Sequence, residues 1–157
     1  SNKYGIVTYQ IDRTLSENGS VSRGICKIEN NILKDVVEHT NIFRDDENIV
    51  FEEKNISGTI EESTPVSMNF WVLHPSIFRA LEDKFDNFMT INSKELKAEF
   101  FLPQVINELI HDKKVEVIAE QSSDQWFGIT YPDDKMLVQT EINSKIEDGL
   151  YPQKLWN

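Results

Sequence analysis

The sequence lacks most of the features that would place it quickly in a functional class. Its 157 residues include a single cysteine, Cys26, which excludes an internal disulfide and a cysteine-rich metal site. No apolar run approaches the ~20 residues that span a bilayer, and no secretory signal is visible at the start of the chain. We therefore expect a cytoplasmic protein without a membrane partner, and a buried, unreactive thiol at Cys26.

Positive charge is also scarce. Lysine and arginine number 16 against 27 aspartates and glutamates, which leaves a net charge of −11. Because an acidic surface repels phosphate backbones, nucleic acid is a poor partner, and an anionic ligand needs local donors or a metal to hold it. With 39% hydrophobic and 27% charged residues, the chain has the composition of one globular domain over 1–157.

The common catalytic signatures are missing as well. The chain has no glycine-rich phosphate loop, no histidines at metal-binding spacing and no Gly-x-Ser-x-Gly elbow. The acidic pair Asp133-Asp134 follows Pro132, where charges near the positive end of a helix dipole have a structural explanation. Motif chemistry alone therefore assigns this chain no task.

Strand signals dominate the first half of the chain. Runs rich in β-branched and aromatic residues predict strands at 4–9, 22–29, 32–40, 65–73, 115–119 and 126–130. Asn18-Gly19 and Asn30-Asn31 predict the turns between the first three. Residues 41–63 are polar and acidic, with one strand-like piece at 49–51, and we expect a β-arm here.

The hydrophobic period changes to that of a helix after Pro75. Asn92 and Glu95 have the spacing of a capping box, so a second helix is expected to open there and continue to the next strand. A third helix is expected from Pro132 to Gly149, followed by an apolar tail that docks on the body. The element order predicts an α/β class, a mixed sheet with three helices.

Several segments, taken together, resemble the second half of the nucleotidyltransferases that couple an NTP to a sugar phosphate or a similar phosphorylated acceptor. In chain order these segments are 4–7, 32–40, 67–78, 99–103 and 126–134. The first is similar to the family's Tyr-Gly-Val-Val strand, and the last to its Trp-x-Asp-Val-Gly-Thr-Pro-Glu-Asp motif. No single motif is specific, so the resemblance depends on their order and spacing over nearly the whole chain.

The resemblance implies the C-terminal half of a nucleotide-diphospho-sugar transferase-like fold of Rossmann type. An N-terminal half of the same protein would then supply the NTP-binding loop, its basic residues and a metal-binding aspartate. The chain begins with Ser1-Asn2 rather than methionine, and we expect it to be cut from a longer protein. Mg²⁺ is expected in the full-length protein and not on this chain, which alone should be inactive and should not bind NTP tightly.

Carried over residue by residue, the resemblance implies an acceptor-binding site and no catalytic residue in this half. Its substrate-binding residues would be Glu38, Asn69, Glu99 and Trp126. Glu38 would accept hydrogen bonds from ligand hydroxyls, Asn69 would offer a donor and an acceptor, and Glu99 would line the same pocket. Trp126 is better explained as a core residue than as a ligand platform.

Two positions depart from the family's pattern. His39 stands where the family has a lysine, so a fixed positive charge near the phosphate is either lost or becomes pH-dependent. Gly128 stands where many members have a second metal-binding aspartate, so either the metal is held differently or this half binds none. Residues 14–24 and 149–156 are similar to a narrower bacterial group, some of it labelled choline-phosphate or lipopolysaccharide-linked, and this match fixes no substrate.

Two other functions fit the same observations. The chain would also suit a non-catalytic module whose pocket recognises a sugar-like ligand. It would equally suit an interaction module that forms a homodimer through the polar arm at 41–63. Net acidity and the missing phosphate loop are compatible with all three functions, so the sequence leaves them open.

Overall fold

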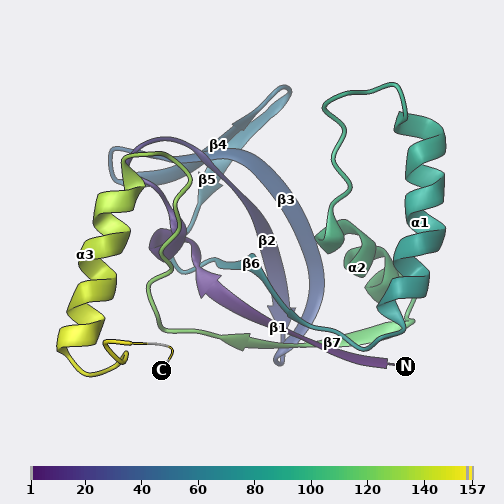
Figure 1. The fold of residues 1–157 in the computed structure, drawn as a ribbon. Coiled ribbons are helices and arrows are strands. Elements are labelled where there is room, and N and C mark those ends of the chain that lie inside the picture. The colour runs from purple at the N-terminus through teal and green to yellow at the C-terminus, as the bar shows by residue number, and fades with distance from the viewer. Residues whose placement is uncertain (1, 155, 157) are drawn as a thin grey trace.

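The computed structural model describes residues 2–154 and 156. Over these residues the chain forms seven strands, three α-helices and one 3-10 turn (Figure 1). In chain order they are β1 (Asn2–Gln10), η1 (Ile11–Thr14), β2 (Val21–Glu29), β3 (Ile32–Asp45), β4 (Asn48–Glu53), β5 (Ile56–Ile60), β6 (Pro65–Val72), α1 (Ile77–Asn92), α2 (Leu102–His111), β7 (Val115–Gln121) and α3 (Asp134–Glu147). No helix among the described residues is long and apolar enough to cross a membrane.

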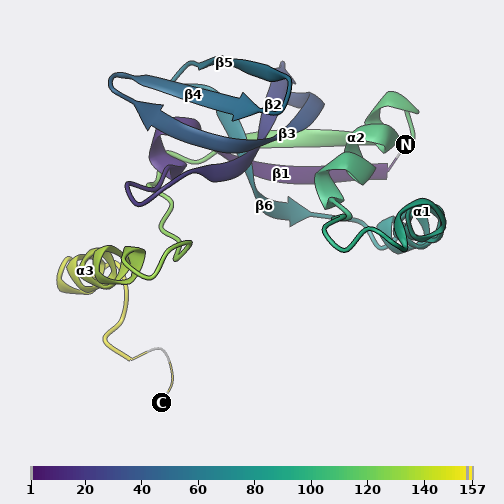
Figure 2. The same cartoon turned by 90° about the horizontal axis from the view of Figure 1, so that it is seen from above.

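Five of the strands form a small closed barrel. Their order is β2-β6-β1-β7-β3, and the pairing of β2 with β3 joins the two ends. Within this barrel β1 and β7 run parallel, and the other neighbours run antiparallel. β4 and β5 continue the sheet from the far end of β3 and form a hairpin arm (Figure 2).

The expected Rossmann-type fold is wrong. A sheet of that type is open and mostly parallel with helices on both faces, whereas this one closes on itself and has one parallel pair. The closing pair, β2 and β3, is joined by a tight turn in which Asn30 and Asn31 have left-handed φ angles of 52° and 60°. Such a turn matches the twist of its strands, so β3 folds back along β2 and its residue Ile32 reaches Ile118 of β7.

Two apolar clusters lie on opposite faces of the sheet. The larger lies between the barrel strands and α2, which buries Val105, Ile106 and Leu109 in it. The smaller lies beneath the arm and consists of Ile11, Val21, Ile42, Ile49 and Val66. Cys26 belongs to the larger cluster, and burial raises its pKa to about 12, so the expected buried thiol is confirmed.

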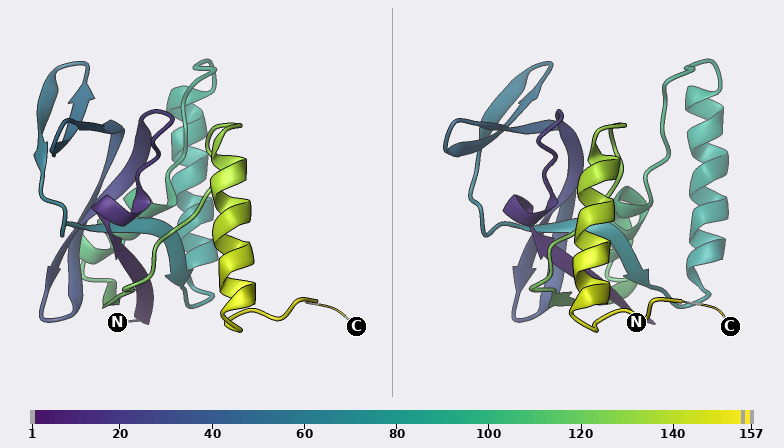
Figure 3. Two further views of the ribbon diagram at one scale, coloured as in Figure 1. Left: turned by 90° about the vertical axis from the view of Figure 1, so that its left-hand side faces the viewer. Right: turned by 60° about the vertical axis from the view of Figure 1, so that its left-hand side comes forward.

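The other two helices lie at opposite sides of the molecule and bury little. Among the described residues, α1 buries only Ile77 and α3 only Asp134. α3 stands apart from the sheet, and the tail runs on from its end without folding back (Figure 3). Tyr151 is 50% exposed and Trp156 is 86% exposed, so the expected docking of the tail is wrong, while Leu155 lies outside the described residues.

Two local predictions are also wrong. Residues 126–130 form no strand, and Asn92 ends α1 instead of opening a helix, so that 93–101 are irregular. The side chain of Asn92 donates to the Phe88 carbonyl oxygen at 3.0 Å, one turn back in the same helix. The Asn92 side chain therefore bonds to the last turn of α1 and does not cap the start of a new helix.

Because α2 is the helix that closes the larger cluster, its truncation should be costly. Ile106 is fully buried, and Ile106→Ala should lower the free energy of unfolding by about 2–5 kcal/mol through the cavity that it leaves. Met136 on α3 is 78% exposed, and Met136→Ala should change it by less than ~0.5 kcal/mol. Urea unfolding followed by circular dichroism measures both. Equal losses would mean that α3 packs as firmly as α2.

Candidate functional site

A row of small and polar residues crosses the barrel at the edge of its apolar cluster. Strand register places Glu38 opposite Gly24, Gly24 opposite Ser67, Ser67 opposite Thr8 and Thr8 opposite Gln121. Residues directly opposite one another on paired strands face the same side of the sheet. The row therefore forms a polar margin on the face that carries the larger cluster.

Glu38 lies on this row with its carboxylate over the backbone of Gly24. A Cβ atom added to Gly24 would lie 3.3 Å from Glu38 Oε2 and 3.0 Å from Val36 Cγ2, so a larger residue here would require these side chains to shift by a few tenths of an ångström. Burial raises the pKa of Glu38 above its ordinary value, Arg23 and His39 oppose the rise, and Glu99 adds to it. Within the described part of the chain, no donor hydrogen-bonds to this carboxylate.

The carboxylate opens onto a hollow of about 660 Å³ between the barrel, the arm and the start of α2. Its lining residues are Glu38, Thr40, Glu52, Glu53, Lys54, Asn55, Ile56 and Phe101. Three of these are acids and one is a cation, so the hollow has a negative potential. It offers acceptors to a ligand and repels a phosphate.

Arg23 is the buried cation next to Glu38. Its Nε donates to Thr14 Oγ1 at 3.1 Å, Nη1 donates to the Ser22 carbonyl oxygen at 2.7 Å, and Nη2 donates to the Thr14 carbonyl oxygen. Burial lowers the pKa of Arg23 to about 10, against the attraction of Glu38. The guanidinium is thus held by neutral carbonyl and hydroxyl oxygens, and it acts on Glu38 through its field.

Trp126 supports Arg23 from the segment after β7. The guanidinium lies 5.3 Å from the centre of its ring, within range of a cation–π interaction. A Cβ atom on Gly128 would lie 1.8 Å from a carbon of the same ring. The Trp126 ring therefore fills the space that a side chain at 128 would need. Its contacts with Arg23 and Gly128 are explained by packing.

Asn69 sits in a bulge of β6 with a left-handed φ of 57°. Its backbone N–H donates to Ser67 Oγ at 3.1 Å, and its side-chain oxygen accepts a hydrogen bond from Trp71 Nε1 at 3.2 Å. The bulge lies between the residue pairs Val7–Phe70 and Thr8–Ser67 of the β1–β6 ladder. It turns an otherwise buried strand position outward, so the Asn69 amide is exposed.

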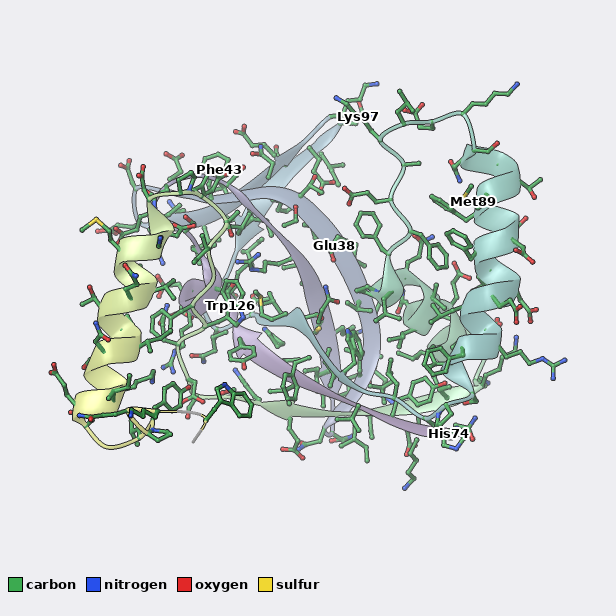
Figure 4. All side chains as sticks on the ribbon, in the orientation of Figure 1. Glu38, Phe43, His74, Met89, Lys97 and Trp126 are labelled. Atoms are coloured by element: carbon green, nitrogen blue, oxygen red, sulfur yellow. The ribbon has the colours of Figure 1, made fainter. Side chains whose placement is uncertain are left out.

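Of the four sequence-predicted residues, Glu38 alone is among the residues that line the hollow of about 660 Å³, so the expectation that Glu99 lines the same pocket is not met. Glu38 and Glu99 interact directly through their charges, and Glu99 lies on the irregular segment before α2. Asn69 is joined to Ser67 on the polar row, while Trp126 is joined to Glu38 only through Arg23. Figure 4 shows Glu38 facing the space beside α2 and Trp126 nearer α3.

His39 points away from this group. As the residue after Glu38 on an extended strand it faces the arm, where its ring lies 4.3 Å from that of Phe51 and its Nδ1 lies 3.3 Å from Glu53 Oε1. The resemblance implies a positive charge near the ligand phosphate at position 39. In the structure the His39 side chain contacts the arm instead.

Sequence reasoning missed the residues that build the polar row. Thr8 and Ser67 are buried, and Arg23, near the start of β2, is only 8% exposed. Gly24 carried the one available signal, since a glycine inside a strand pattern marks a bulge or a close approach. The remaining residues could be recognised only from the register of the strands.

Asp134 is the buried carboxylate that the sequence explained as a helix-start charge. Its Oδ1 accepts hydrogen bonds from Ser16 Oγ at 2.9 Å and Asn18 Nδ2 at 2.7 Å. Its Oδ2 accepts the backbone N–H groups of Thr130 at 2.9 Å and Tyr131 at 2.7 Å. These bonds lower its pKa to about 2 and tie the loop after η1 to the start of α3.

The described residues around Asp134 and Gly128 do not form a site for a Mg²⁺ ion. Both oxygens of Asp134 are occupied by two donors each, and the Trp126 ring lies against Gly128. No group of three or more histidine, cysteine, aspartate or glutamate residues within the described chain could hold a metal ion. A hard cation needs several oxygen ligands, which this region does not supply.

Comparison with known proteins adds no family. No protein-family model matches the chain, and no curated protein matches it significantly.

The raised pKa of Glu38 predicts how stability depends on pH. The folded protein holds this proton more firmly than the unfolded chain, so the contribution of Glu38 is favourable in acid and is lost as pH rises through the raised pKa. Glu38→Gln should therefore be at least as stable as the parent at pH 7, and the two should converge near pH 4. Thermal melts measure this, with Glu47→Gln on an exposed turn as control. A large destabilisation at pH 7 would contradict it.

Asp134 predicts the opposite dependence. Its pKa of about 2 lies below the unfolded value, so its contribution is present above that unfolded value and is lost as pH falls through about 2. Asp134→Asn should lower the melting temperature at pH 7, and the difference should vanish near pH 2. Asp133→Asn, one residue away and exposed, should leave the melting curve almost unchanged at both pH values. Parallel curves for Asp134→Asn and the parent at every pH would contradict this assignment.

Proposed function

We propose that this chain is the acceptor-binding part of a nucleotidyltransferase that transfers a nucleotidyl group from an NTP to a sugar 1-phosphate or a similar phosphorylated acceptor. The observation that carries the proposal is the half-buried Glu38 carboxylate, which faces a hollow and has no donor among the described residues. Burying a charge without partners is costly. A ligand that donates hydrogen bonds would remove that cost.

Hydroxyl groups of the acceptor are suitable donors for this site. Glu38 and Glu99 would each accept from a hydroxyl, and charge-assisted bonds of this kind are worth roughly 1.5–3 kcal/mol. Asn69 contributes its side-chain nitrogen, which has no hydrogen-bond partner among the described residues, while its oxygen is held by Trp71. The resemblance to sugar-phosphate enzymes supports the same type of ligand.

The charge distribution orients the acceptor. Because acids outnumber cations around Glu38, the hydroxyl groups would lie toward the carboxylates and the phosphate would lie away from them. An NTP-binding part elsewhere in the protein would then meet the phosphate from the open side. The ligands of any Mg²⁺ would come from that part and from the phosphates.

The closed barrel favours a second candidate. A small barrel with a polar margin is a common frame for holding a ligand without chemistry, and the described residues would then form a non-catalytic sugar-binding module. The two candidates differ in what they require of the ligand. A nucleotidyltransferase acceptor must carry a phosphate, whereas a simple sugar-binding module needs only hydroxyl groups.

Calorimetry of the chain with glucose 1-phosphate, phosphocholine and glucose tests the proposal. We expect Glu38→Gln and Asn69→Gly to weaken binding of the phosphorylated acceptor about tenfold, because each removes a hydrogen bond made to the ligand. Glycine is chosen at 69 because it adopts the left-handed φ of 57° without strain, whereas alanine would adopt it at a cost of roughly 1 kcal/mol. Glu47→Gln is the matched control and should bind as the parent does.

Three results would change the conclusion. Parental affinity in both folded variants would mean that the acceptor site lies elsewhere. Equal affinity for glucose and glucose 1-phosphate would favour the non-catalytic module. Micromolar binding of an NTP with Mg²⁺ to this chain alone would contradict the proposal that another part of the protein binds the NTP.

A further inference from the structure

β5 is the outermost strand of the sheet and lies along the outer side of the arm (Figure 2). The strand order ends at β5, which pairs with β4 alone, whereas β2 at the other end of the order pairs with β3. An open strand edge presents a row of N–H and C=O groups that can pair with another chain. The edge of β5 is therefore a candidate interaction surface.

β5 carries none of the features that commonly protect an edge strand from such pairing. Its sequence, ISGTI, contains no charged residue and no proline, and its register with β4 has no bulge. Ser57 and Thr59 are exposed, and Ile56 is 54% exposed. A partner on this edge would cover an apolar side chain as well as the backbone.

The hairpin turn decides which backbone groups face the open edge. β4 and β5 are joined by two residues, so the residues that flank this turn, Glu53 and Ile56, exchange both of their backbone hydrogen bonds. Bonded pairs alternate with unbonded pairs along an antiparallel ladder, so every second residue of β5 bonds to β4 in this way. The residues between them, Ser57 and Thr59, direct their N–H and C=O groups to the open edge, and no other described residue bonds to these groups.

A second copy of β5 matches this edge in one register. Two antiparallel copies related by a two-fold axis at Gly58 pair over the whole strand, and Ser57 of each copy then lies opposite Thr59 of the other. These are the residues whose backbone groups face the edge, so each such pair exchanges both hydrogen bonds. On the other face of the strand Ile56 lies opposite Ile60 of the second copy, which covers its exposed side chain.

The charges beside β5 match a copy of this chain. Lys54 lies in the turn before the strand, and Glu61 and Glu62 follow its end. Antiparallel pairing brings the start of one strand to the end of the other, so Lys54 approaches the two acids of the second copy at both ends of the interface. Glu62 pairs with Arg44 at 3.0 Å, whereas Lys54 and Glu61 are exposed and have no ion pair within the described chain.

We propose that the chain forms a two-fold homodimer by antiparallel pairing of β5 with β5 of a second copy, in the register that places Gly58 opposite itself. Backbone hydrogen bonds along the edge provide the affinity, and the sheets of the two copies become continuous. The interface is small, so the dimer is weak and forms at high protein concentration. It does not depend on the nucleotidyltransferase function proposed for the site beside Glu38.

Sedimentation equilibrium from about 10 µM to about 1 mM tests for the dimer, because a small interface requires a high concentration. The buffer contains about 0.15 M salt, which screens the repulsion between two chains of net charge −11. We expect the mass of the parent to rise from 18.2 kDa towards twice that value. A parent that keeps the mass of one chain at every concentration would refute the proposal.

Two variants at one position separate edge pairing from other association. Thr59→Pro should keep the mass of one chain throughout, because proline removes the N–H that faces the edge and is tolerated on an edge strand. Thr59→Val retains the N–H and is the matched control, which should associate as the parent does. Circular dichroism confirms that both fold. A folded Thr59→Pro variant that still dimerises would place the interface elsewhere.

Disulfide formation tests the register and needs no proline. Ser57→Cys and Thr59→Cys are oxidised separately and as an equal mixture. In the proposed register these two positions lie opposite each other with about 5.5 Å between Cα atoms, which a disulfide spans, whereas two copies of the same position lie diagonally and too far apart. Cys26 is buried and its pKa is raised to about 12, so it does not compete.

We expect the mixture to cross-link about tenfold faster than either cysteine variant alone, because only the mixture brings two thiols within bonding distance. Equal rates in all three samples, faster cross-linking of a single variant with itself, or no cross-linked dimer in the mixture would each overturn the proposed register.

Discussion

The pairing of β2 with β3 is the interaction on which the remaining architecture depends. It runs along almost the whole of β2, brings the start of β3 to β7, and so converts a sheet with two edges into a closed one. The same pairing places Glu38 over Gly24 and sets the polar row at the edge of the core. Because a shift of one residue would turn the Glu38 side chain to the other face of its strand, the candidate site exists only in this register.

Glu38 and Asp134 are carboxylates whose surroundings shift their pKa values in opposite directions. Asp134 receives four hydrogen bonds, its pKa falls, and it joins two loops. Glu38 receives none from the described residues, its pKa rises, and its charge opposes folding at neutral pH. A carboxylate that costs stability and faces a hollow is characteristic of a binding group, whereas one with every lone pair occupied is characteristic of a structural group.

The segment before α2 is shared by two hollows. Phe100 lines a hollow between α1 and α2, Phe101 lines the hollow beside Glu38, and Glu99 acts on Glu38 through its charge. Neighbouring side chains of an extended segment point to opposite sides, so this short piece of chain forms one wall of each space.

Local sequence patterns predict most of the individual strands and helices and little of their assembly. Alternating and helical periods located the strand at Ile32, the helix after Pro75 and the end of α3 near Gly149, because these patterns reflect which face of each element is buried. The resemblance also pointed to Glu38, but it did not predict the burial of this side chain or the hollow that it faces. Closure of the barrel, the turn outward at Asn69 and the packing of Trp126 on Arg23 were decided by the tertiary structure. These features depend on how strands far apart in the sequence pair and on the space left between packed side chains, and a local sequence pattern contains neither.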